Sequence, residues 1–172
     1  INRFGFNNKG VEHLVAQVKK RHYGGIVGIN IGKNLTTSVE QALDDYLLCL
    51  DAVHGVADYI AVNISSPNTP GLRTLQFGEQ LDALLGPIRA RSQALDNALG
   101  RKVPLLVKIA PDMNAEEVAL VAGSISRNGL DGVIATNTTL GREGVAGPVR
   151  PPDRLRRHRD VDLGTMQVVQ DG

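Results

Sequence analysis

Short apolar runs alternate four times with longer segments of helical periodicity. The expected strands cover residues 26–31, 59–64, 103–109 and 132–136, and each run is nearly continuous in Val, Ile and Ala. Such runs are typical of parallel strands that are buried on both faces. The segments between them repeat apolar residues every three or four positions, which predicts amphipathic helices.

The expected helices have recognisable ends. The first centres on the apolar residues of 11–18, and the second opens with a capping box, Thr37 to Glu40, and stops near Gly55. A third covers about residues 78–91. The fourth begins at Asn114, a good N-cap, and ends before Gly129.

Polar residues lie at or just after the end of each expected strand, and their distribution separates two α/β architectures. They are Asn30, residues 63–68, Lys108 and residues 137–139. In a doubly wound open sheet only a switch point would collect such groups, whereas in a (β/α)8 TIM barrel all strand ends converge on one mouth. Four consecutive polar ends favour the barrel. Because a barrel typically needs about 250 residues, we expect only about its middle half here.

Composition excludes several classes of protein. The chain has 172 residues, 42% of them hydrophobic and 22% charged, with a formal net charge of +1, which gives no global field for nucleic acid. No apolar run is long enough to span a bilayer. Cys49 lies among leucines and is expected in the core. His13, His22 and His54 lack metal-ligand spacing, so no metal site is expected.

The densest polar stretch runs over residues 63–76 and contains two Ser, two Asn and two Thr, together with Pro67 and Pro70. Proline stiffens such a loop, and neutral amides and hydroxyls suit a planar ligand with many hydrogen-bonding groups. The alternative is a Ser/Asn/Pro turn without a special role.

Lys108 interrupts an otherwise apolar strand and must face something polar, because a buried unpaired ammonium is costly. An anionic ligand at the barrel mouth would provide this, and the alternative is a Lys that snorkels from the strand end. The segment 28–34 contains Gly and Lys but lacks the spacing and the trailing Ser or Thr of a phosphate-binding P-loop.

Five motifs, in the same order, resemble those of class 2, quinone-dependent dihydroorotate dehydrogenases. They are NRFGFN from Asn2, GINIGKN from Gly28, NISSPNTPGLRTLQ from Asn63, VKIAPD from Val107 and DGVIATNTT from Asp131. The resemblance covers residues 1–140. It implies a partial FMN-binding barrel over this range, and the oxidation of dihydroorotate to orotate in pyrimidine biosynthesis, with FMN as cofactor and a quinone as electron acceptor.

The resemblance also implies roles for individual residues. Ser66 matches the catalytic base, where class 1 enzymes carry Cys. The residues that match substrate ligands are Asn2, Arg3, Phe4, Gly5, Phe6, Asn63, Asn68, Asn137 and Thr138. The residues that match FMN contacts are Asn30, Asn63, Lys108 and Thr136. The alternatives are a class 1 enzyme or another pyrimidine-handling flavin barrel, and a non-catalytic truncated barrel.

The segment 141–172 is rich in Arg and Pro and departs from the family pattern. We expect a disordered or non-native end, such as a frameshift would produce, and the alternative is a basic interaction patch at residues 154–159.

The whole enzyme is expected on the cytoplasmic side of the inner membrane, held peripherally by a preceding segment. The chain alone is expected to be inactive, soluble or aggregated, with exposed strand edges at residues 26–31 and 132–136.

Overall fold

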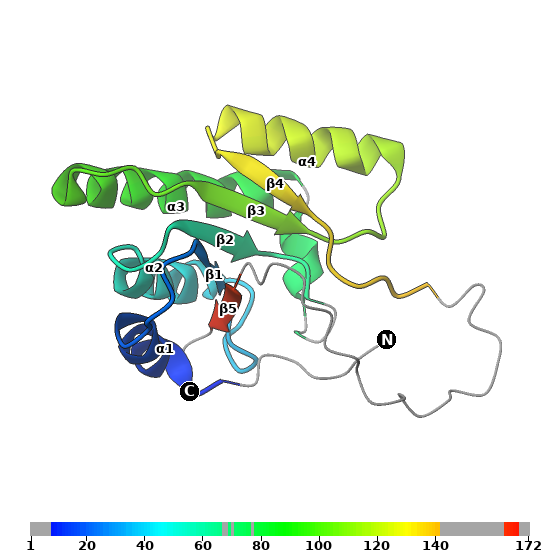
Figure 1. Cartoon of the computed structure of the whole chain (residues 1–172). Coiled ribbons are helices and arrows are strands. Elements are labelled where there is room, and N and C mark those ends of the chain that lie inside the picture. The colour runs from blue at the N-terminus through cyan, green and yellow to red at the C-terminus, as the bar shows by residue number, and fades with distance from the viewer. Residues whose placement is uncertain (1–7, 67–68, 70, 77, 142–163, 169–172) are drawn as a thin grey trace, which may run out of the picture.

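The computed structural model describes residues 8–66, 69, 71–76, 78–141 and 164–168, the last of these as backbone only. Helices and strands alternate along the chain (Figure 1). In chain order the elements are α1 (Gly10–Lys19), β1 (Val27–Ile31), α2 (Ala42–Val53), β2 (Tyr59–Asn63), the 3-10 helix η1 (Leu72–Gln76), α3 (Gly78–Leu99), β3 (Leu105–Ile109), α4 (Ala115–Arg127), β4 (Gly132–Ala135) and β5 (Gly164–Val168).

The strands form one parallel sheet in the order β4-β3-β2-β1-β5. Figure 1 shows α4, α3, α2 and α1 arranged in the same order as the strands from β4 to β1. The order of β1 to β4 follows the chain without reversal, so no switch point lies among these four strands. With right-handed crossovers, this order places the connecting helices on one side of the sheet, as in part of a (β/α)8 barrel.

The expected strands agree with the observed ones to within two residues, and two helices differ from expectation. The predicted capping box at Thr37 does not start a helix, because α2 begins only at Ala42, so this prediction was wrong. The Ser38 hydroxyl instead accepts a hydrogen bond from the Gln41 N–H (3.3 Å), and the Thr37 carbonyl accepts one from Lys33 Nζ (2.5 Å). These contacts hold a turn ahead of the helix.

Helix α3 runs on to Leu99, past Pro87 and beyond the expected end near residue 91. The start of α4 is as expected. The Asn114 side chain accepts from the Glu117 N–H (2.9 Å), and the Glu117 carboxylate accepts from the Asn114 N–H (2.8 Å). This reciprocal pair satisfies two amide groups at the helix start, the geometry of a capping box.

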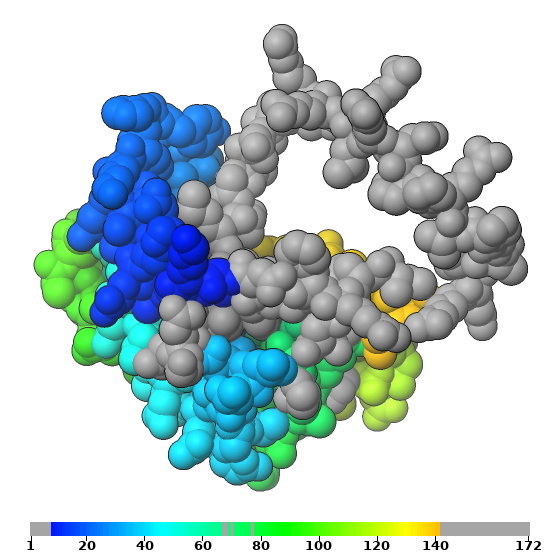
Figure 2. Space-filling view, turned by 90° about the horizontal axis from the view of Figure 1, so that it is seen from below, coloured from blue at the N-terminus to red at the C-terminus, as the bar shows by residue number. Residues whose placement is uncertain are grey.

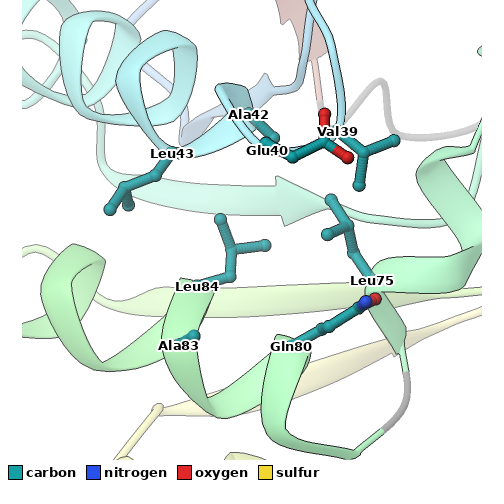
Figure 3. A pocket seen from close by; sticks show the side chains of 8 residues that line it. All are labelled: Val39, Glu40, Ala42, Leu43, Leu75, Gln80, Ala83 and Leu84. Atoms are coloured by element: carbon teal, nitrogen blue, oxygen red, sulfur yellow. The ribbon is translucent and has the colours of Figure 1, made fainter.

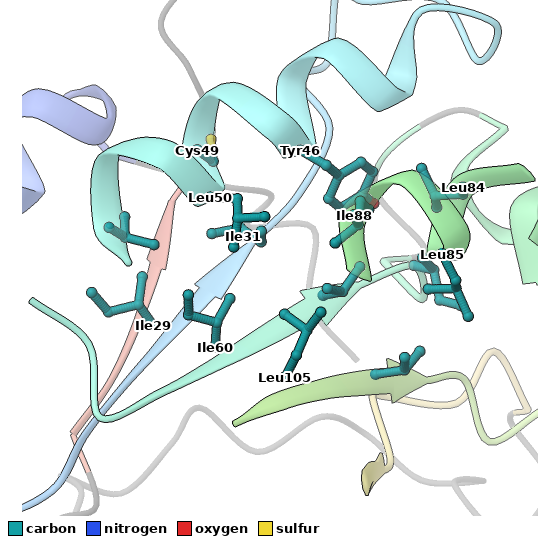
Figure 4. Packing of buried hydrophobic residues seen from close by; sticks show 14 of the residues in the cluster. Ile29, Ile31, Tyr46, Cys49, Leu50, Ile60, Leu84, Leu85, Ile88 and Leu105 are labelled. Carbon is teal, nitrogen blue, oxygen red and sulfur yellow. The ribbon is translucent and has the colours of Figure 1, made fainter. Parts of the chain in front are cut away.

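The hydrophobic core lies between the helices and one face of the sheet. Figure 4 shows Ile29, Ile60 and Leu105 from three successive strands beneath residues of α2 and α3 such as Leu50 and Ile88. All five side chains are fully buried. Cys49 is also fully buried in this cluster, which confirms its predicted place in the core.

The strands are less uniformly buried than the apolar runs in the sequence predict. Strands β1 and β2 are buried almost throughout, but buried and half-buried residues alternate along β3, and every residue of β4 is exposed or half-buried. The edge of β1 pairs with β5, so the expected exposed edge at residues 26–31 is wrong, whereas β4 does end the sheet. In the space-filling view of Figure 2, α1 and the segment after β4 lie at opposite sides of the molecule.

The prediction of a disordered or non-native end stays a prediction. Residues 142–163 and 169–172 lie outside the described part of the chain, and the five residues of β5 are described only as a parallel strand beside β1. The expected basic patch at residues 154–159 also lies outside the described residues.

Candidate functional site

Three of the predicted cofactor residues project from the face of the sheet opposite the hydrophobic core. Asn63 pairs with Lys108 across β2 and β3, and Asn30 pairs with Ala61 across β1 and β2. Side chains alternate between faces along a strand, and partners in register share a face. Asn30, Asn63 and Lys108 therefore share one face, while their neighbours Ile29, Ile31 and Val107 pack into the core.

Two amide atoms on this polar face lack hydrogen-bond partners among the described residues. They are Asn30 Oδ1 and Asn63 Nδ2, on side chains that are 1% and 0% exposed. An unsatisfied buried polar atom costs about 1–3 kcal/mol, and such groups are rare in native proteins. Arg89 Nε and Ser92 Oγ also lack partners, but they belong to α3. The two amides thus mark the polar face as a place for a hydrogen-bonding ligand.

Lys108 adds a cation to the same face. Its side chain is half-buried, and this burial lowers the pKa of its ammonium group from the ordinary value. No charged neighbour contributes to the shift, and the described residues form no ion pair with Lys108. An anionic ligand beside Lys108 would therefore offset the cost of its burial.

The chain after β2 meets the chain after β4 through a short hydrogen-bond relay. Asn137 Nδ2 donates to Ser65 Oγ (3.2 Å), and Ser65 Oγ donates to Asn63 Oδ1 (2.9 Å). The Asn137 backbone N–H donates to the Ile109 carbonyl (3.0 Å), at the end of β3. Ser66 is only 5% exposed and directly follows Ser65. The predicted base thus directly follows a residue that links two predicted substrate ligands, Asn63 and Asn137.

The remaining predicted residues lie beyond or outside this cluster. Thr136 and Thr138 are exposed, just after β4, and the Thr138 N–H donates to Asn137 Oδ1 (2.8 Å). The other predicted substrate residues lie outside the described part of the chain, and they are Asn2, Arg3, Phe4, Gly5, Phe6 and Asn68. The roles assigned to all of these residues stay predictions.

Sequence reasoning missed the role of Tyr46. Its side chain is fully buried, and its hydroxyl donates to the Asn63 carbonyl (2.7 Å), which ties α2 to the end of β2. Burial raises the pKa of the Tyr46 phenol well above its ordinary value, so the hydroxyl stays a donor. Helical spacing identified Tyr46 as a core residue, but nothing local predicted which carbonyl its hydroxyl would reach.

Arg73 and Asp112 were also missed, although both lie within the motifs described above. Arg73 Nη1 donates to Asp112 Oδ2 (2.8 Å), and Arg73 Nε donates to the Ser65 carbonyl (3.2 Å). The two residues are 39 positions apart and lie on η1 and after β3. Their place within motifs that resemble those of the family was the only signal available in the sequence.

An apolar groove of about 330 Å³ lies elsewhere, between the start of α2 and the start of α3 (Figure 3). Its lining includes Leu43, Leu75 and Leu84 and none of the predicted site residues.

Among the described residues, no group of three or more His, Cys, Asp or Glu could hold a metal ion. Within the same residues, no helix has the length and hydrophobicity needed to cross a membrane.

Comparison with known proteins gives consistent matches over most of the chain. A family model described as dihydroorotate dehydrogenase matches residues 1–151. A Cellvibrio japonicus protein named dihydroorotate dehydrogenase (quinone) is 67% identical over 147 residues, which are 86% of this chain and 43% of that protein. A Pseudomonas aeruginosa protein of the same name is 62% identical over the same shares of both chains.

Solved structures give the same result for the fold. A crystal structure of DHODH from Eimeria tenella in complex with ferulenol has a TM-score of 0.76 and 35% identity, and it covers 84% of this chain and 44% of that one. The ligand-free form from the same organism also has a TM-score of 0.76, with 36% identity and coverage of 86% and 46%. The chain thus spans less than half the length of these relatives. The predicted fold, part of a (β/α)8 barrel, is confirmed.

Proposed function

Because the chain belongs to the dihydroorotate dehydrogenase family, we propose that it forms part of the site that oxidises dihydroorotate to orotate, with FMN as bound cofactor and a quinone as electron acceptor. The observation that carries this proposal is the polar face of the sheet. Asn30 Oδ1 and Asn63 Nδ2 are buried without partners, and Lys108 has no anionic neighbour among the described residues. A flavin ring, which carries both donors and acceptors and becomes anionic when reduced, fits all three.

The cofactor residues would have distinct tasks. When bound, FMN would supply the hydride acceptor for the reaction. The Asn30 and Asn63 amides would hold the edge of the ring by hydrogen bonds, and Thr136 would add a contact after β4. Lys108 would stabilise negative charge next to the ring, where its half-buried position makes the electrostatic effect stronger than in water.

Ser66 would act as the base that removes a proton from C5 of dihydroorotate. A serine hydroxyl is a weak base, so it has to pass its own proton on to a positioned water or relay group. Ser66 is buried, which favours a fixed orientation toward the substrate over exchange with bulk water. Asn63, Asn137 and Thr138 would bind the carbonyl and N–H groups of the substrate, and buried amides of this kind discriminate against analogues that lack those groups. The predicted substrate residues Asn2–Phe6 and Asn68 remain part of this proposal.

A quinone is the acceptor that fits best. The curated relatives at 61–67% identity are named for a quinone-dependent enzyme, and Ser66 stands where class 1 enzymes carry Cys. A quinone dissolves in the lipid bilayer, so we propose that the whole enzyme acts at the membrane surface. A class 1 enzyme is the second candidate.

The proposal is tested with a chimera, in which the 147-residue part of this chain that matches the Cellvibrio japonicus protein replaces the matching segment of that protein. We expect the purified chimera to contain flavin and to reduce a quinone analogue with dihydroorotate. Ser66→Ala should lower turnover about 10²–10⁴-fold, the range for loss of a general base, without loss of flavin.

Ser38→Ala is the matched control, because Ser38 is exposed in the turn before α2 and lies outside the site. It should leave turnover unchanged. A chimera that binds flavin but does not oxidise dihydroorotate would contradict the proposal, and so would full turnover in the Ser66→Ala variant. Electron transfer to a soluble acceptor in place of a quinone would count against the quinone-dependent assignment.

A further inference from the structure

The short helix η1 touches the chain after three neighbouring strands, and its Arg73 makes most of these contacts. Arg73 Nε donates to the Ser65 carbonyl (3.2 Å), Nη1 to Asp112 Oδ2 (2.8 Å) and Nη2 to the Thr138 carbonyl (3.0 Å). These acceptors follow β2, β3 and β4, respectively. A guanidinium is well suited to this task, because its donors are fixed in one plane and point in different directions.

Asp112 extends the connection from Arg73 to the chain after β4. It accepts hydrogen bonds from the Leu140 N–H (3.1 Å) and from the Thr139 hydroxyl. The Thr139 hydrogen bond is the main reason that the pKa of Asp112 lies below its ordinary value, and the Leu140 N–H and Arg73 act in the same direction. The carboxylate is therefore charged at neutral pH, and it connects η1 on one side to the chain after β4 on the other.

Gln76 anchors the other end of η1. Its side chain is 2% exposed, and its Oε1 accepts from the Ala110 N–H (3.0 Å), directly after β3. Its Nε2 donates to the Arg73 carbonyl (3.3 Å). Leu72 and Leu75 of the same helix are also buried. Arg73 therefore projects from a base that is itself fixed to the sheet.

We infer that Arg73 is a positioning residue that holds the loop with Ser66 against the chain with Asn137 and Thr138, an inference that rests on the proposed function. Ser65, which Arg73 holds through its carbonyl, directly precedes Ser66 and accepts from Asn137 through its hydroxyl. The proton on C5 and the base have to lie within hydrogen-bonding reach, and a displacement of about 1 Å can cost about 100-fold in rate. Arg73 thus sets the distance between the base and the substrate ligands.

The contacts of Arg73 predict a specific pattern of effects. Its side chain is 21% exposed and that of Asp112 is 30% exposed, and partly exposed ion pairs contribute little to stability. None of its hydrogen bonds reaches Asn30 or Lys108. Loss of Arg73 should therefore reduce turnover much more than it reduces flavin binding or thermal stability.

The test uses Arg73→Ala, Arg73→Lys and Arg91→Ala in the chimera. Arg91 is the matched control, because it also pairs with an aspartate, Asp51, but between α3 and α2 (2.6 Å). We expect Arg73→Ala to lower kcat about 10–100-fold with flavin content retained, and Arg91→Ala to leave kcat unchanged. Arg73→Lys should recover only part of the loss, since an ammonium cannot reach three separated acceptors in a plane.

Amide hydrogen exchange of the same proteins gives a readout that does not depend on turnover. Arg73→Ala should speed exchange at residues 64–66 and also at residues 138–141, because it releases both sides of the connection, whereas Arg91→Ala should change neither segment. Unchanged exchange and unchanged kcat in Arg73→Ala would overturn the inference, as would equal losses in both arginine variants. An inactive unmutated chimera would contradict the proposed function, and the exchange data would still decide the role of Arg73.

Discussion

Polar groups at the amino ends of the strands have hydrogen-bond partners, whereas several at the carboxyl ends have none among the described residues. At the amino ends, aspartates accept hydrogen bonds from the first backbone N–H groups. Asp58 accepts from the Val27 N–H (2.7 Å), Asp96 from the Val103 N–H (2.8 Å), and Asp131 from the Leu105 N–H (2.9 Å). Cations and a histidine complete these groups, as Arg21 does for Asp58 and His54 for Asp96.

At the carboxyl ends, buried groups have been left without partners from the described chain. Asn30 Oδ1, Asn63 Nδ2 and the ammonium group of Lys108 all lie on the polar face. The amino ends therefore contribute stability, whereas the unpaired groups at the carboxyl ends lower it. This division is general in (β/α)8 barrels, whose active sites lie at the carboxyl ends of the strands.

Removal of Asp131 should have the largest effect on stability. Burial raises the pKa of its carboxyl, but the hydrogen bonds from Lys102 and the Leu105 N–H outweigh burial and lower it overall. Asp131→Ala should lower the free energy of unfolding of the 172-residue chain by about 2–3 kcal/mol, because it leaves a strand N–H without its partner. Urea unfolding measures this. Asp51→Ala is the control, since its pair with Arg91 is exposed and should contribute less than about 1 kcal/mol. Equal losses of stability in Asp131→Ala and Asp51→Ala would show that Asp131 at the amino end of β3 contributes no more than an exposed ion pair.

Substitution of Lys108 should have a smaller effect of opposite sign. Lys108→Met keeps the length of the side chain and removes a half-buried ammonium that lacks an anionic neighbour among the described residues. We expect the flavin-free chain to gain about 0.5–1 kcal/mol in urea unfolding, a gain typical of relieved functional strain. The same substitution in the chimera should lower its flavin content. A loss of stability in the flavin-free chain would show that Lys108 has a structural partner.

The smallest effect should be a pH dependence at the amino ends. Burial lowers the pKa of His54 below its ordinary value of 6.5, although Asp96 acts against the shift. Below pH 6.5 the unfolded chain therefore binds a proton before the folded chain does. The stability that neutral His54 contributes should be fully retained well above pH 6.5, and the free energy of unfolding should fall as the pH drops through the lowered pKa. Urea midpoints between pH 5 and 7.5 measure the slope.

His54→Gln is the control for this slope. Glutamine keeps a donor for Asp96 but does not titrate, so the difference between the two chains isolates the histidine. The slope of the unsubstituted chain should exceed that of the variant in this pH range. Identical slopes would mean that His54 is protonated equally in the folded and unfolded chains.

Much of the architecture was predictable from local sequence. The four apolar runs became β1 to β4, and the spacing of polar residues after them predicted that Asn30, Asn63 and Lys108 would gather at the strand ends. This succeeded because side-chain alternation and helical periodicity are properties of neighbouring residues. The predicted start of α2 was wrong, since Lys33 binds the Thr37 carbonyl and Ser38 accepts from the Gln41 N–H, contacts that hold a turn before the helix and that a four-residue motif does not reveal.

Only the tertiary structure determined which donor forms a hydrogen bond with which acceptor. Arg73 and Thr138 are 65 positions apart, and Tyr46 and Asn63 are 17 apart, yet both pairs share a hydrogen bond. A sequence records that these side chains can donate, but a donor finds its acceptor only after the strands have paired in register and the helices have packed on them. By itself, the sequence determined the elements, the polar strand ends and the family resemblance. The packed sheet determined the connection through Arg73, because long-range hydrogen bonds depend on distances that local periodicity does not encode.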